Sequence, residues 1–168
     1  MATKYLSNQS GTITETVAAT VGGAIDSEKI PTLDVNGKLT LAMMPSGLSS
    51  KDVQSIETSE SLAAGNLVNI WNNAGVFNVR NADATSVAKR AHGYVLAAFT
   101  HPATAEVYFE GTNTSLTGLT AGDVYLATTA GQLTNTPPSD TGQIIQRVGV
   151  ATSATSVNAE FSDPIVLA

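Results

Sequence analysis

The chain contains no cysteine, and only 13% of its 168 residues are charged. The absence of cysteine excludes disulfide bonds, thiolate metal sites and cysteine nucleophiles, and it makes folding independent of the redox compartment. Aromatic residues are also scarce, at 5%, while serine and threonine are abundant. We therefore expect a neutral, hydroxyl-rich surface and a stability that comes from packing or oligomerisation.

Basic side chains are few, with 8 lysine and arginine residues against 14 acidic residues and a formal net charge of −6. Nucleic-acid binding needs clustered cations that displace the counterions of phosphates, and these cations are scattered. The longest apolar run, residues 95–99, is far shorter than a membrane span. The first residues carry a lysine with no apolar segment behind it, so no signal peptide is expected. These features predict a soluble protein, made in the cytoplasm, that binds neither nucleic acid nor a membrane.

The distribution of apolar residues along the chain differs between residues 1–53 and residues 54–168, and we predict a domain boundary between these two segments. The first stretch has isolated apolar residues, which bury too little area to offset the ordering entropy of the chain. It therefore predicts an extended N-terminal arm that is either disordered or ordered against another surface. Within the arm, alternation over residues 12–17 favours a strand, and the Asn36-Gly37 pair favours a hairpin over residues 33–39.

From residue 54 onward, short apolar-rich runs recur with turn residues between them. They predict strands at residues 66–71, 75–80, 92–99, 105–110, 123–127, 143–151, 155–161 and 164–167. The first two runs are expected to pair as a hairpin, and a single helical turn capped by Asp83 is expected within residues 83–91. Short, evenly spaced strands predict a mainly β fold, with a compact β-sandwich or barrel after the arm.

The residue types that carry catalysis lack the spacing that catalysis requires. His92 and His101 have no companion at metal-ligand spacing, which favours structural or exposed positions for both. Glu106 and Glu110 would lie roughly 13 Å apart along one strand, too far for the carboxylate pair of a glycosidase. No serine lies in a nucleophile elbow. We therefore expect a protein that is not an enzyme and needs no metal or cofactor.

Several blocks of the C-terminal part carry a family resemblance. They are residues 62–72 (LAAGNLVNIWN), 79–84 (VRNADA), 91–96 (AHGYVL), 107–111 (VYFEG), 146–151 (QRVGVA) and 163–168 (DPIVLA). In this order they resemble the capsid decoration, or cement, proteins of tailed bacteriophages. The resemblance implies a structural role on the outer surface of the virion, where the protein would bind the major capsid protein and stabilise contacts between capsomers.

The arm carries a second resemblance, at residues 22–39 (GGAIDSEKIPTLDVNGKL) and 43–45 (MMP). These segments are similar to modules of phage fibre and decoration proteins that often form trimers. The resemblance implies a homo-oligomer, with a trimer favoured over a dimer. A tail-fibre or head-fibre component that mediates host attachment is the alternative.

The arm is expected to make most contacts with the capsid and with neighbouring subunits, because its aliphatic residues are too sparse for a core yet too apolar for a solvated tail. Burial of one such side chain contributes about 1.5–3 kcal/mol. The candidate contact residues are Ile13, Val17, Val21, Ile25, Ile30, Leu33, Leu39 and Leu41.

Overall fold

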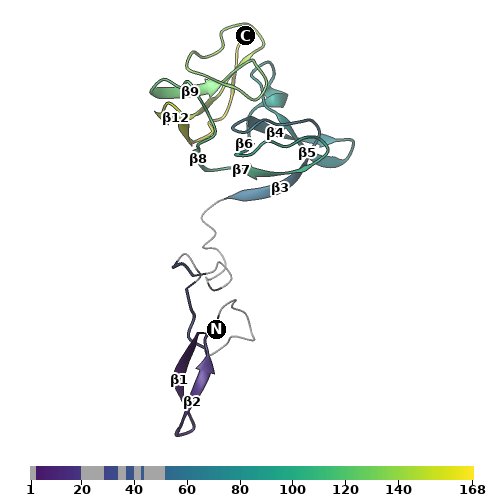
Figure 1. The fold of residues 1–168 in the computed structure, drawn as a ribbon. Helices are drawn as coiled ribbons and strands as arrows, with labels where there is room; N and C mark the ends of the chain where they lie inside the picture. The colour runs from purple at the N-terminus through teal and green to yellow at the C-terminus, as the bar shows by residue number, and fades with distance from the viewer. Residues whose placement is uncertain (1–2, 20–28, 34–36, 40–42, 44–51) are drawn as a thin grey trace. The chain divides into compact units, whose positions relative to one another are not determined.

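The computed structural model describes residues 3–19, 29–33, 37–39, 43 and 52–168. The chain divides into two compact units, Met1–Ser50 and Lys51–Ala168. The described part of the N-terminal unit contains one β hairpin, and the other strands belong to the C-terminal unit (Figure 1). The predicted fold class is confirmed, because the chain is mainly β and the C-terminal unit contains a closed barrel.

The N-terminal hairpin pairs β1 (Lys4–Gln9) with β2 (Thr12–Val17) in antiparallel register. Its turn residues, Ser10 and Gly11, have positive φ angles of 52° and 86°, and the Asn8 Oδ1 atom accepts a hydrogen bond from the Gly11 amide at 2.9 Å. Two residues with positive φ match the right-handed twist of the flanking strands. The strand predicted over residues 12–17 is confirmed, whereas its partner β1 was not predicted. The hairpin predicted over residues 33–39 lies partly outside the described residues.

The barrel has the strand order β3-β5-β4-β6-β7. Its strands are β3 (Val53–Thr58), β4 (Leu67–Asn73), β5 (Val76–Asn81), β6 (Gly93–Tyr94) and β7 (Thr104–Tyr108). The predicted hairpin between β4 and β5 is confirmed. β3, which the sequence analysis did not predict as a strand, closes the barrel by pairing in parallel with β5 and antiparallel with β7.

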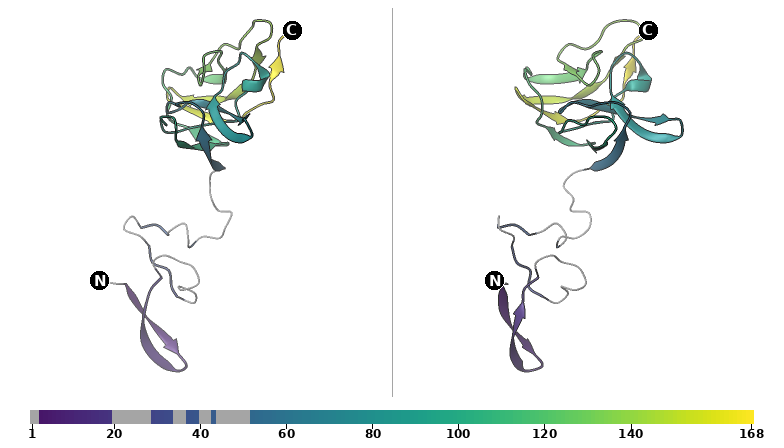
Figure 2. Two further views of the ribbon diagram at one scale, coloured as in Figure 1. Left: turned by 90° about the vertical axis from the view of Figure 1, so that its right-hand side faces the viewer. Right: turned by 45° about the vertical axis from the view of Figure 1, so that its right-hand side comes forward.

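An antiparallel sheet with the order β10-β9-β12-β13-β8 lies beside the barrel (Figures 1 and 2). Its strands are β8 (Gly111–Asn113), β9 (Gly122–Leu126), β10 (Leu133–Thr134), β12 (Arg147–Ser153) and β13 (Ser156–Ala159). A separate two-stranded ribbon pairs β11 (Ile144–Ile145) with β14 (Ile165–Val166). The predicted strand at 143–151 is therefore two strands, and β8 and β10 lie in segments for which no strand was predicted.

Two apolar clusters form the core of the C-terminal unit. The first comes from the barrel strands and the segments beside them, and consists of Leu62, Val68, Val79, Val95, Ala105 and Val107. The second joins barrel residues such as Leu67 and Tyr94 to Val124 and Leu126 of the sheet. Successive residues of a strand face opposite sides, so Leu67 packs in one cluster and Val68 in the other. The start of β4 is therefore buried on both faces, which explains why two apolar residues, Leu67 and Val68, follow one another there.

The helical turn expected within residues 83–91 exists, but its predicted cap is wrong. The turn is a 3-10 helix, η3 (Val87–Lys89), whose N-cap is Ser86. The Ser86 side chain accepts a hydrogen bond from the Ala88 amide, while the Asp83 carboxylate is occupied by Thr85 and by the Lys89 ammonium. The strand predicted at 92–99 is also too long, because only Gly93–Tyr94 is paired as a strand.

Candidate subunit and capsid contact surface

The β1–β2 hairpin presents two chemically different faces. In an antiparallel pair, directly opposed residues share a face. The pairs Lys4–Val17, Leu6–Glu15 and Asn8–Ile13 therefore define one face, which we call the apolar hairpin face. The pairs Tyr5–Thr16, Ser7–Thr14 and Gln9–Thr12 define the opposite, hydroxyl-rich face.

The apolar hairpin face is the more exposed of the two. Leu6 is 74% exposed, Ile13 64% and Val17 45%. On the hydroxyl-rich face, by contrast, Tyr5 and Ser7 are half-buried. Soluble two-sided elements normally place apolar residues inside and hydroxyl groups outside, so this hairpin has the reverse arrangement. Three exposed aliphatic side chains on one face make this face a candidate interaction surface.

Side chains of the hydroxyl-rich face are hydrogen-bonded to other residues of the N-terminal unit. The Ser7 and Thr16 hydroxyls are hydrogen-bonded at 2.7 Å, and the Tyr5 hydroxyl accepts a hydrogen bond from the Ile30 amide at 3.4 Å. Beside the hairpin, Ala19 forms a parallel bridge with Pro31, which ties residues 29–33 to the end of β2. These contacts leave the apolar hairpin face without a covering segment from the described part of the unit.

Five of the eight predicted contact residues are described, and all five are exposed. They are Ile13, Val17, Ile30, Leu33 and Leu39. Val21, Ile25 and Leu41 lie outside the described residues. The sequence analysis missed Leu6, because only its pairing with Glu15 places it on the same face as Ile13 and Val17. Among the described residues of this unit, the buried hydrophobic side chains are Ala18 and Ala19, which cannot form a core.

The C-terminal unit exposes fewer large apolar residues, and it does so at separate points. Val76 and Phe77 lie at the tip of the β4–β5 hairpin, Val87 lies in η3, and Ile165 and Val166 form β14. Phe77 is 77% exposed. These spots differ from the apolar hairpin face, where three side chains lie together on one small sheet.

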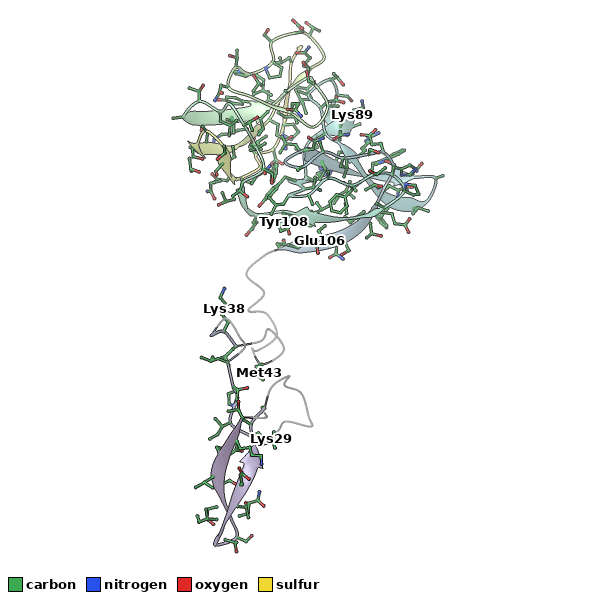
Figure 3. All side chains as sticks on the ribbon, viewed as in Figure 1. Lys29, Lys38, Met43, Lys89, Glu106 and Tyr108 are labelled. Carbon is green, nitrogen blue, oxygen red and sulfur yellow. The ribbon has the colours of Figure 1, made fainter. Side chains whose placement is uncertain are left out.

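The titratable groups of the C-terminal unit serve packing and surface contacts. No group of three His, Asp or Glu side chains within the described ranges could hold a metal ion. Tyr94 stacks on Tyr108 at 5.5 Å between ring centroids, and burial raises the pKa of both hydroxyls. Glu106 lies next to Tyr108 on β7 (Figure 3) and raises its pKa further. The Glu106 and Glu110 side chains are both exposed.

Among the open, polar hollows on the C-terminal unit, two have a histidine in their lining. One, of about 470 Å³, is lined by polar groups that include Glu57, Asn78 and His101. Their polar atoms are largely used within the fold, since the Asn78 amide donates to the Glu57 carbonyl and accepts from Asn73. The other, of about 650 Å³, lies between His92, Phe109 and Phe161. In the first hollow the Thr58 hydroxyl lies 3.4 Å from the His101 Nδ1. Thr58 is buried, its hydroxyl accepts a hydrogen bond from the Ala103 amide, and the same Nδ1 lies 2.9 Å from the Thr58 carbonyl, so these groups are used within the fold.

No helix in the described part of the chain is long and apolar enough to cross a membrane. No protein-family model matches the chain, and neither a curated protein nor a solved structure is significantly similar to it. Its function must therefore be inferred from the residues and their arrangement.

The stability of the C-terminal unit is expected to fall on mild acidification because of His92. Burial lowers the pKa of this half-buried histidine, and the Arg90 guanidinium lowers it further. The ring accepts a hydrogen bond from the Ile70 amide at Nδ1 and faces the Arg90 Nε at Nε2, both at 3.0 Å. Because the folded-state pKa lies below the unfolded one, the contribution of His92 is present above about pH 6.5 and is lost below it.

Thermal unfolding between about pH 7.5 and pH 5 should show this loss, a range that lies above the titration of ordinary carboxylates. His92→Asn, whose Oδ1 can replace Nδ1 as the acceptor, should flatten the dependence of the unfolding midpoint on pH. Phe77→Thr, which changes an exposed residue that carries no titratable group, is the control and should keep the wild-type slope. A slope that is unchanged by His92→Asn would contradict the assignment.

Proposed function

We propose that this protein is a capsid decoration protein of a tailed bacteriophage, which binds the outer surface of the head and stabilises contacts between capsomers of the major capsid protein. The observation that carries the proposal is the exposure of aliphatic residues in the N-terminal unit, whose described residues form no core: Leu6, Ile13, Val17, Ile30, Leu33 and Leu39. The resemblance of most of residues 56–168 to cement proteins supports the same role.

The two units suit a division of labour. In this proposal, the N-terminal unit contacts the major capsid protein and neighbouring copies, and the compact β domain projects outward from the head. Many copies act on one shell, so a modest affinity of each copy is amplified by multivalency. The role requires no catalysis and no cofactor, and it involves neither nucleic acid nor a membrane. We propose a homo-oligomer, with a trimer favoured over a dimer.

Removal of residues 1–50 is expected to leave a folded, soluble β domain that no longer binds shells. The domain keeps both apolar clusters, since all their members lie between residues 56 and 161. The measurement is co-sedimentation of the full and shortened chains with genome-free shells that lack this protein. The full chain carrying Phe77→Thr is the matched control, because it loses an exposed apolar residue of the β domain and should bind as well as wild type.

Equal binding of the shortened and full chains would exclude the arm from the contact and overturn the proposed division of labour. The number of copies in a purified virion tests the role itself. A decoration protein is present in many copies over the whole head, whereas a few copies at the tail would identify a fibre component.

A further inference from the structure

We propose that the apolar hairpin face is the surface through which copies of this chain bind one another. The occupant of the face is a second copy of the same hairpin. This inference deepens the homo-oligomer of the proposed function and rests on it, and it assigns to that contact a residue, Leu6, that the sequence analysis did not single out.

The geometry of the face favours burial against a protein surface. Val17, Leu6 and Ile13 occupy successive rows of the hairpin and alternate between its two strands, so they form one diagonal apolar stripe. Diagonal neighbours on a sheet face are close enough for such side chains to touch. An isolated two-stranded hairpin is marginally stable in water. A second layer on this face would supply the apolar packing that the hairpin lacks.

The charges of the face favour a second copy as that layer. Lys4 and Glu15 lie on the same face as the apolar stripe, and their side chains form an ion pair at 3.0 Å. The face is therefore neutral in a chain whose formal net charge is −6. Two copies meet here without the repulsion that their net charges would cause elsewhere. Each copy also offers one cation and one anion, so the copies can exchange Lys4–Glu15 pairs across the contact.

The first test measures the mass of the full chain in solution by light scattering during gel filtration. We expect the wild type to have the mass of more than one chain. The variant Leu6→Thr/Ile13→Thr/Val17→Thr should dissociate at about 100-fold higher concentration, since three buried aliphatic contacts are lost. Threonine keeps the strand preference of these positions. Phe77→Thr, an equally exposed apolar residue of the other unit, is the control and should leave the mass unchanged.

The second test uses charge reversal and does not depend on the stability of one variant. Lys4→Glu makes the face doubly negative, and Glu15→Lys makes it doubly positive. Each variant alone should associate at least about tenfold more weakly than wild type, and an equimolar mixture of the two should recover association. A role of the ion pair within one hairpin would be restored only by the double variant Lys4→Glu/Glu15→Lys, and not by mixing.

A monomeric wild type would overturn the inference, and so would a triple variant that associates as tightly as wild type or a mixture that fails to recover. If the triple variant stayed oligomeric but lost shell binding, the face would belong to the contact with the capsid protein. Shell binding is measured separately, so the two proposals can fail independently. An oligomer that forms through this face but does not bind shells would refute the decoration role alone.

Discussion

Replacing Gln146 with leucine is expected to lower the free energy of unfolding of the β domain by about 3–5 kcal/mol. Gln146 is 2% exposed and lies between β11 and β12. Its Oε1 accepts a hydrogen bond from the Ala91 amide at 2.8 Å, and its Nε2 donates to the Ala91 carbonyl at 2.9 Å. The same Nε2 also donates to the Ser162 carbonyl at 3.1 Å.

The Gln146 side-chain amide thus binds the backbone of Ala91 in the way that a neighbouring strand would. It joins the segment before β6 to the segment that contains Ser162. Leucine has nearly the same volume, but it would leave two backbone carbonyls and one amide without these partners. Each buried group that loses its partner costs about 1–3 kcal/mol.

Chemical denaturation followed by Trp71 fluorescence measures the effect. Gln143→Leu is the matched control, because the Gln143 side chain hydrogen-bonds only with Asp140 in an exposed loop. This control should change the free energy of unfolding by less than about 0.5 kcal/mol. Equal effects of the two variants would show that the Gln146 contacts do not hold the domain together.

Replacing Gly149 with alanine is expected to prevent normal folding of the sheet, with a loss of more than about 4 kcal/mol. A β-carbon at this position would lie 2.0 Å from the Asn158 carbonyl oxygen, far inside contact distance. Gly149 also has a φ of +154° and borders a register shift in the pairing of β12 with β9. The clash is with backbone of the neighbouring strand β13, which cannot move without breaking the ladder.

Gly142→Ala separates this clash from backbone strain. Gly142 has a φ of +85°, but no heavy atom lies within 4 Å of a β-carbon built on it. Its replacement should cost only about 1–2 kcal/mol, the price of a left-handed backbone for a residue with a side chain. The measurements are the soluble yield and the thermal midpoint of both variants. Similar losses for Gly142→Ala and Gly149→Ala would contradict the packing argument.

Local chemistry explains the elements that were predicted correctly. The β4–β5 hairpin follows from two apolar runs around residues 72–75, where Ala74 and Gly75 have φ angles of 52° and 94°. The Asn72 Oδ1 atom accepts from the Gly75 amide at 2.6 Å and closes the turn. Turn and strands lie within a few residues of one another, so the sequence contains all the information that this hairpin needs.

Elements that depend on distant partners were missed. β3 has few apolar residues and gains its strand conformation from β5 and β7. β8, which was also not predicted, pairs with β13, a strand far along the chain, so no local pattern indicates it. The N-cap of η3 was also predicted wrongly. The Asp83 carboxylate is hydrogen-bonded to Lys89 and Thr85, and the N-cap residue is Ser86. Burial raises the pKa of Asp83, but these hydrogen bonds outweigh it and hold the pKa below its usual value.

The candidate contact surface was likewise predicted in part from the sequence and decided in part by strand pairing. Composition alone predicted that the aliphatic residues of the arm are too sparse for a core yet too apolar for a solvated tail, and it gave Ile13 and Val17 as candidate contact residues. Only strand pairing decided that these two share a face with Leu6 and with the Lys4–Glu15 ion pair. The physical reason is that a one-residue shift in register moves every side chain of a strand to the opposite face. The sequence by itself therefore determined the mainly β class, the β4–β5 hairpin and the chemical character of the arm. Tertiary structure alone decided barrel closure, the Gln146 contacts and the composition of each face, because these depend on residues that are far apart in the chain.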